Sequence, residues 1–302
     1  MRLPTREQIV ARGSLKNFLS KYPNGKGQVP TPRDRAAAPN ISGHYYAVVN
    51  AYVNAMAAQT TINPWRPALP SNSDFSLSQM WVVGGADAGT QTVEAGSQIY
   101  PDKYGNADAH VFIYYTGDNY GVNGCYNLDC SAFIQTSSVI PIGGSIPEST
   151  FDGFQFEGTI AWYRDPSTGN WILFLRNADG SYTQAGYYPV YLFGQGTMSL
   201  YASRIDFGGE VYTTNSPPTV PMGSGYNPNY TFPLYSRVAY QRNLAYMDTA
   251  GVIYDYYHST QITEPYGSGC AYGLGLYEAS TPYVPGWGSA IFLGGAGYGN
   301  GC

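Results

Sequence analysis

Residues 75–83 read FSLSQMWVV and are followed by Gly84-Gly85, and this stretch decides the fold class. Its polar and apolar residues alternate at the start, which is the period-two pattern of a strand with one buried face. The paired glycines that follow are typical of a turn that ends the strand. The stretch therefore predicts a β-strand rather than a helix.

Short runs of the same kind continue along most of the chain. Between two of them, residues 165–170 have the composition of a hairpin turn. With 37 Gly, 21 Pro, 30 Tyr and only 12% charged residues, the composition also disfavours long helices. The prediction is an all-β protein, an antiparallel sandwich or barrel, with further strands at 45–52, 110–116, 132–140, 159–163, 171–176, 187–193, 203–207, 238–246 and 290–293.

Residues 1–39 differ from the rest in charge and composition. They hold eight basic and two acidic residues, a net of +6, whereas the remainder holds seven basic (15 − 8) and 18 acidic (20 − 2), a net of −11. Residues 5–21 predict a helix with Thr5 as its cap, and residues 22–40 have the Pro and Gly content of a linker. Residues 1–39 are thus expected to be either a solvated basic tail or a pro-segment, an inhibitor held electrostatically on an acidic domain of residues 40–302.

Several partners are disfavoured by composition. No run of about 18 apolar residues occurs, so no membrane span is expected, and residues 1–10 are too polar for an export signal. Lys103 is the only lysine after Lys26, which argues against nucleic acid as a partner of the main domain.

Four cysteines indicate the compartment. An even count suggests two disulfides and an oxidising, secreted setting, with three pairings open. One pairing would close a small loop and tie down the C-terminus. A zinc site is the alternative, but no CxxC pair occurs, and no metal or cofactor is predicted. The cysteines are Cys125, Cys130, Cys270 and Cys302.

Familiar hydrolase motifs are missing: the sequence has no GxSxG and no HExxH. The three histidines, His44, His110 and His258, lie far apart and are interpreted as strand or surface residues. What remains are two glutamates in strand-like runs, Glu94 in TVEAGSQI and Glu210 in IDFGGEVY.

Period-two geometry gives each glutamate a distinctive neighbourhood. Glu94 shares a strand face with Gly96 and Gln98, and Glu210 shares one with Gly208 and Tyr212. In both runs a glycine two residues away would clear space beside the acid for a substrate backbone. The alternative is that both glutamates are exposed polar positions on solvated strands.

Several motifs, in order along residues 40–302, resemble those of the neprosin family. They are TINPWRP (61–67), FSLSQMW (75–81), VEAG (93–96), PDKYG (101–105), GCYNLDC (124–130) with FIQ (133–135), and GGEV (208–211). The ending, with Cys270 and then Gly294-Gly295 through Cys302, is also similar. Plant members usually have Trp where this chain has Ser97, a difference expected to change the shape of a substrate subsite.

The resemblance implies a strongly bent antiparallel β-sandwich of two large sheets and a peptidase made with an inhibitory pro-segment. It implies cleavage of peptide or protein substrates after proline at acid pH, with Glu94 and Glu210 as the catalytic pair. One glutamate would activate a water and the other would protonate the scissile carbonyl oxygen. Gln98 and Tyr212 are candidate oxyanion donors, and Gln79 and Trp81 are further candidates for contacting substrate.

Two other functions fit the same composition. Aromatic-lined β-sandwiches with two carboxylates also hydrolyse glycosides, although no local Glu-x-Asp-x-x-Glu strand motif occurs here. A non-catalytic carbohydrate-binding module is the second alternative, because tyrosine-rich surfaces bind sugars.

Overall fold

The computed structural model describes residues 43–139, 141–215, 218–228, 235–256, 262–263, 271–277 and 287–298. The predicted helix at 5–21, the pro-segment and the pair Cys270 and Cys302 lie outside these residues. Within them, the strands form two large antiparallel sheets, so the predicted fold class is confirmed.

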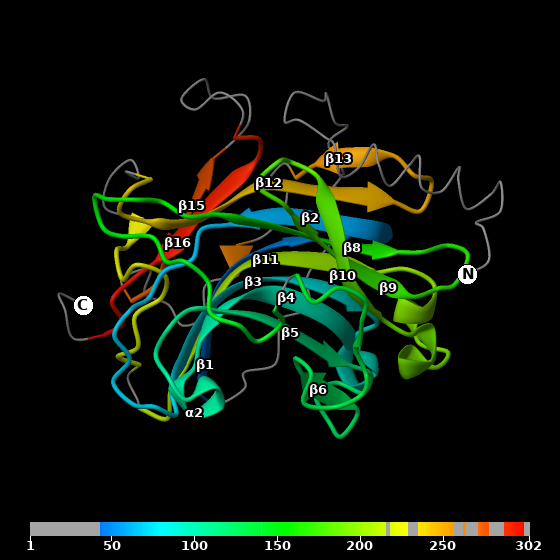
Figure 1. The fold of residues 1–302 in the computed structure, drawn as a ribbon, viewed down its shortest axis with the longest axis horizontal. Helices are drawn as coiled ribbons and strands as arrows, with labels where there is room; N and C mark the ends of the chain where they lie inside the picture. The colour runs from blue at the N-terminus through cyan, green and yellow to red at the C-terminus, as the bar shows by residue number, and fades with distance from the viewer. Residues whose placement is uncertain are drawn as a thin grey trace.

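The first sheet has seven strands in the order β14-β1-β11-β3-β4-β5-β6. In Figure 1 its central strands form an arch, and the short helix α2 (Pro101–Tyr104) and β6 lie on the lower side of the molecule. The strands are β14 (Ile262–Thr263), β1 (His44–Ala51), β11 (Arg204–Tyr212), β3 (Phe75–Gly84), β4 (Gln91–Ile99), β5 (His110–Thr116) and β6 (Gly124–Tyr126).

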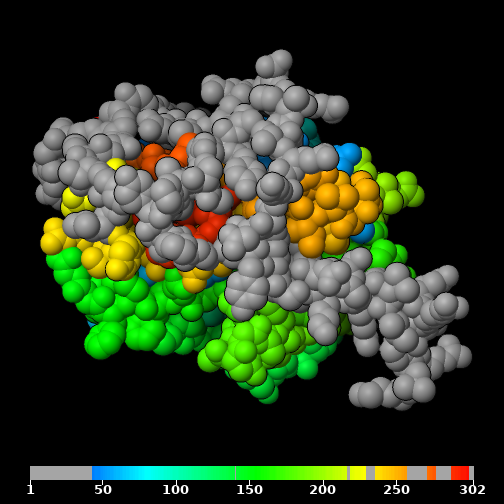
Figure 2. Space-filling model, turned by 90° about the horizontal axis from the view of Figure 1, so that it is seen from above, coloured from blue at the N-terminus to red at the C-terminus, as the bar shows by residue number. Residues whose placement is uncertain are grey.

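The second sheet has nine strands in the order β15-β16-β12-β2-β8-β9-β10-β7, with β13 paired to β12. Figure 2 shows the molecule from this side, where β13 (orange) and β16 (red) reach the surface. The strands are β15 (Gly273–Tyr277), β16 (Ala290–Gly294), β12 (Ala239–Asp248), β2 (Ala55–Ile62), β8 (Gly158–Arg164), β9 (Trp171–Arg176), β10 (Tyr182–Tyr188), β7 (Ile134–Gln135) and β13 (Ile253–Asp255).

The main core lies between the two sheets. Strand alternation sends Met80 and Phe207 of the first sheet inward, where they share a cluster with Trp162 and Trp171 of the second. Burying side chains of this size contributes about 1.5–3 kcal/mol each, which fixes the face that each strand presents to the core. The opposite face of the first sheet, called the outer face below, carries the alternate residues.

One buried side chain ties the second sheet to the middle of the first. Gln241 on β12 donates from Nε2 to the main-chain oxygens of Gln79 (3.0 Å) and Gly208 (2.8 Å), and it accepts from Thr60 Oγ1 (3.1 Å). Because a buried amide without partners would be costly, these bonds fix the separation of the sheets at this point.

Most expected strands are confirmed, with three differences. Residues 132–140 contain only the two-residue strand β7, because the segment is largely exposed and has little to pack against. The strand expected at 187–193 begins earlier, at Tyr182, and ends at Tyr188, because Pro189 cannot donate to the ladder; a 3-10 helix (Val190–Phe193) follows. The alanine-rich strand β2 and the shorter strands β6, β13, β14 and β15 were not predicted.

The predicted disulfide between Cys125 and Cys130 is confirmed. It removes two of the four thiolates that the zinc alternative requires. Among the described residues, no helix is both long and apolar enough to cross a membrane.

Candidate active site

Strand register places Glu94 and Glu210 on the outer face of the seven-stranded sheet. Strand β3 lies between β11 and β4, so that Glu210 is opposite Leu77 and Glu94 is opposite Trp81. Leu77 and Trp81 are four residues apart on one strand and therefore point to the same side. The two carboxyls, 116 residues apart in sequence (210 − 94), thus share one face.

Between the two glutamates, the middle of the sheet carries Gln79 flanked by two glycines. Gly208 pairs with Gln79 on one side and Gly96 on the other. A Cβ added to Gly96 would lie 2.2 Å from the Ser78 carbonyl oxygen, and one on Gly208 would lie 2.1 Å from that of Ala47. The glycines therefore permit a close approach of neighbouring strands, in addition to the predicted clearance beside each acid.

Glu94 is 4% exposed and is held by hydroxyl groups. Thr92 Oγ1 (2.7 Å) and Tyr120 Oη (2.8 Å) both donate to its Oε1. The pKa of Glu94 is raised to about 7, chiefly by burial and also by the nearby charge of Glu210, while hydrogen bonds from Thr92, Tyr120 and Gln79 act in the opposite direction.

Glu210 is 7% exposed and is held by a ring nitrogen as well as by the hydroxyl of Tyr46. His44 Nδ1 on β1 lies 2.5 Å from Glu210 Oε1. The imidazole packs against Tyr212 (4.7 Å between ring centroids) and Phe75 (5.7 Å). This contact joins residues 166 positions apart, and it gives Glu210 a neighbour that can carry a positive charge.

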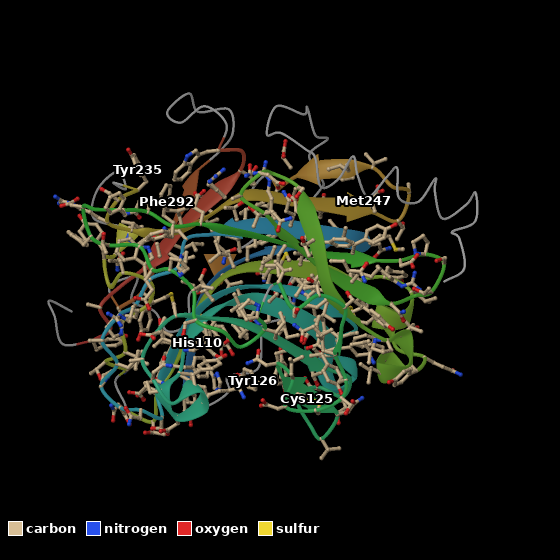
Figure 3. All side chains as sticks on the ribbon, in the orientation of Figure 1. His110, Cys125, Tyr126, Tyr235, Met247 and Phe292 are labelled. Atoms are coloured by element: carbon tan, nitrogen blue, oxygen red, sulfur yellow. A yellow bond between two sulfur atoms is a disulfide. The ribbon has the colours of Figure 1, made fainter. Side chains whose placement is uncertain are left out.

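Three tyrosines lie within electrostatic reach of both glutamates. Burial raises the pKa of Tyr46, Tyr120 and Tyr126, and the charges of Glu94 and Glu210 raise all three further. Figure 3 shows Tyr126 on the lower side of the molecule beside Cys125, opposite Met247 and Phe292 on the upper side. The two carboxyls therefore share a common phenolic surrounding.

The other predicted site residues lie on the same face. Gln98 is fully buried; its Oε1 accepts from Tyr104 Oη (3.0 Å), and its Nε2 has no hydrogen-bond partner among the described residues. Gln79 is also buried, with Oε1 similarly unpaired within the described part of the chain. Trp81 is buried, and its ring centroid lies 6.4 Å from that of Tyr46. Tyr212 stacks on Phe75, with 5.6 Å between the ring centroids.

Ser97 does not lie on this face. It is opposite Ser78 and lines a small gap between the two sheets together with Trp65. Strand alternation turns position 97 toward the core, so any effect of Ser97 on a subsite would be indirect, and it stays a prediction.

Sequence reasoning did not assign a role to His44, Thr92, Tyr120, Tyr46 or Tyr126. His44 is a strand residue, as predicted, but it also contacts Glu210. Thr92 could have been found, because period-two alternation puts it on the face of Glu94. The others reach the site through long-range strand pairing or a loop, for which the sequence holds no local signal.

Comparison with known proteins gives one family and several similar structures. Residues 72–296 match the sequence model of the neprosin family. Scytalido-glutamic peptidase with a peptide-based transition state analog has a TM-score of 0.43 and 12% identity, covering 84% of this chain and 98% of that one. The same peptidase with a transition state analog inhibitor has a TM-score of 0.45 and 12% identity, covering 83% and 97%. SCP-B, a member of the Eqolisin family of peptidases, in a complex with the tripeptide Ala-Ile-His has a TM-score of 0.41 and 10% identity, covering 84% and 98%.

Proposed function

We propose that this chain, which belongs to the neprosin family, is an acid-active glutamic endopeptidase whose catalytic pair is Glu94 and Glu210. The observation that carries the proposal is that two buried carboxyls share one sheet face while their surroundings differ. Peptide hydrolysis without a nucleophilic side chain needs an activated water and a proton donor, and two carboxyls in opposite protonation states supply both.

The surroundings support an assignment of roles. Glu94, with its pKa raised to about 7, holds a proton in acid, so it serves as the acid. Glu210, beside the His44 imidazole, serves as the ionised base.

The reaction then proceeds in two balanced steps. Glu210 takes a proton from water as the water oxygen bonds to the scissile carbonyl carbon, and Glu94 gives its proton to the carbonyl oxygen. In the second step Glu210 returns its proton to the leaving nitrogen as the C–N bond breaks, and Glu94 recovers a proton from a hydroxyl of the intermediate. Both carboxyls end in their starting states. The unpaired Gln98 Nε2 is suited to donate to the developing oxyanion.

The family also suggests a preference for cleavage after proline. The outer face offers partly buried aromatic side chains for such a ring, because Tyr46 and Tyr114 pack against the buried cluster of Trp81, Phe75, Phe112 and Leu77. Aromatic faces pack well against flat, rigid rings.

Two further proposals concern maturation. The net charge of +6 on residues 1–39 and −11 on the remainder supports an inhibitory segment held by attraction near neutral pH and released as carboxylates protonate. High salt at pH 7 should then loosen the segment, and failure to do so would contradict the electrostatic account. The Cys125–Cys130 disulfide supports a secreted, oxidising setting.

The direct test is cleavage of proline-containing peptides by the acid-treated protein at about pH 3–5. Glu94→Gln and Glu210→Gln should each lower kcat/KM by at least about 10²-fold. The matched control is Glu157→Gln, because Glu157 pairs with Arg242 on the second sheet and should tolerate the change. Peptide cleavage that survives in both active-site variants would overturn the proposal, and release of reducing ends from polysaccharides would favour a glycoside hydrolase.

A further inference from the structure

The side chain of Tyr120 lies between solvent and the buried carboxyl of Glu94. Tyr120 lies in the loop between β5 and β6, and its hydroxyl donates to Glu94 Oε1 at 2.8 Å. The residue is 44% exposed, whereas Glu94 is only 4% exposed. The ring therefore covers this side of the carboxyl, and its hydroxyl makes the contact.

The loop holds Tyr120 in a conformation that tyrosine seldom adopts. Asn119 and Tyr120 have φ values of 58° and 59°, in the left-handed region, which is unfavourable for a bulky residue. Strain of this kind persists only where the surroundings enforce it, and it concentrates at functional sites.

Hydrogen bonds on both sides of Tyr120 enforce this backbone. The Tyr120 amide donates to Thr116 Oγ1 (2.8 Å), and the Asn119 amide donates to the Thr90 carbonyl at the start of β4 (2.8 Å). On the other side of Tyr120, the carboxylate of Asp118 accepts hydrogen bonds from the backbone amides of Gly121, Val122 and Asn123. The loop is thereby fixed to the strand that carries Glu94.

The charged groups around this contact do not by themselves keep Glu94 neutral or ionised. Glu210 on β11 faces it with like charge, and the phenols of Tyr46 on β1, Tyr114 on β5 and Tyr126 on β6 lie on the same sheet face. Tyr188 on β10, in the core between the sheets, is also within electrostatic reach of Glu94. Arg204 approaches Tyr120 from β11 but is paired with Asp206 (3.0 Å). Water exclusion and hydroxyl donation are therefore the effects that Tyr120 controls.

We propose that Tyr120 is a positioning residue with two opposed effects on Glu94: its ring excludes water and retains the carboxyl proton, while its hydroxyl favours the ionised form. The balance would set the upper pH limit of catalysis. This inference rests on the proposed function, because it treats Glu94 as the proton donor. It differs from a purely structural role in predicting opposite results for two substitutions at one position.

The two substitutions are Tyr120→Phe and Tyr120→Asn. Phe keeps the cover and removes the donor, so the pKa of Glu94 should rise and the alkaline limb of kcat/KM should move up by about one pH unit. Asn removes the cover and tolerates the left-handed backbone, so water should enter and the limb should move down by a similar amount. Thr92→Val, which removes the other donor without uncovering the carboxyl, should behave like Tyr120→Phe.

Two readouts separate this inference from the proposed function. The first is the pH profile of kcat/KM, and the second is infrared titration of the Glu94 carboxyl, identified by its loss in Glu94→Gln, which needs no activity. Tyr191→Phe and Tyr191→Asn are controls, because Tyr191 is 70% exposed on another segment. Shifts of the carboxyl in the same direction for Phe and Asn, or no shift in either, would overturn the role of Tyr120 even if the peptidase assignment holds. Opposite shifts in a protein that cleaves no peptide would leave Tyr120 as the control of Glu94 and reject the peptidase assignment.

Discussion

The surroundings of Glu94 and Glu210 differ although the two side chains are identical. Glu94, on β4, receives two hydroxyl donors on one oxygen. Glu210 has a histidine 2.5 Å away on the neighbouring strand. Burial without a cation favours the neutral carboxylic acid, whereas a neighbour able to carry positive charge favours the carboxylate. The proposed roles of acid and base rest on this difference.

The largest effect should come from replacing each glutamate by glutamine. At position 210 the amide cannot accept a proton from water, so kcat/KM should fall by about 10⁴-fold. At position 94 the amide can still donate a hydrogen bond to the carbonyl oxygen, so the loss should be nearer 10²-fold. Steady-state kinetics of the two variants at acid pH measure this difference. A larger loss at 94 than at 210 would reverse the assigned roles.

The next effect is on stability. The pKa of Glu94 is raised from 4.5 to about 7, so the folded state binds the proton more tightly than the unfolded state. This contribution is fully present below pH 4.5 and is lost as pH rises through about 7, which amounts to about 3 kcal/mol. Urea unfolding at pH 4 and pH 8 should show that loss in the parent.

The control for this prediction is a pair of variants. Glu94→Gln should remove the part of the pH dependence that comes from this carboxyl, because an amide does not titrate in that range. Glu157→Gln should follow the parent, since Glu157 lies in an ion pair with Arg242 away from the site. An unchanged slope in Glu94→Gln would mean that burial of Glu94 does not hold its proton.

Local sequence patterns predict which strand face each glutamate occupies, but not which strands pair to bring the two glutamates and their partners together. Alternation in TVEAGSQI and IDFGGEVY correctly gives the faces of Glu94, Gln98 and Glu210. That β3 lies between β4 and β11, and β1 beside β11, depends on pairing between distant segments. His44 and Tyr120 were therefore not predictable as partners. The strand wrongly extended past Tyr188 had a local signal, Pro189, that was available in the sequence.

A smaller loss of activity is expected from replacing Gln98. This residue lies on β4, the strand of Glu94, and it pairs with Leu77 of β3, the residue that pairs with Glu210 on the other side. Its unpaired Nε2 is a donor suited to the oxyanion, so Gln98→Leu should lower kcat by up to about 10²-fold with little change in KM. Tyr212→Phe retains the ring stacked on Phe75 and should change kcat much less. Equal losses in both variants would indicate that the face was disturbed as a whole.

The smallest effect should come from His44. Removing the ring in His44→Ala takes away the neighbour of Glu210, so kcat should fall by about 10-fold while KM changes little. His44→Gln keeps an N–H donor but cannot carry charge, so it distinguishes hydrogen bonding from charge. If Gln restores the rate across the acid range, orientation of the carboxylate is sufficient. If Gln does not restore the rate, the charge of His44 is required, and the contrast with Glu94 is electrostatic in origin.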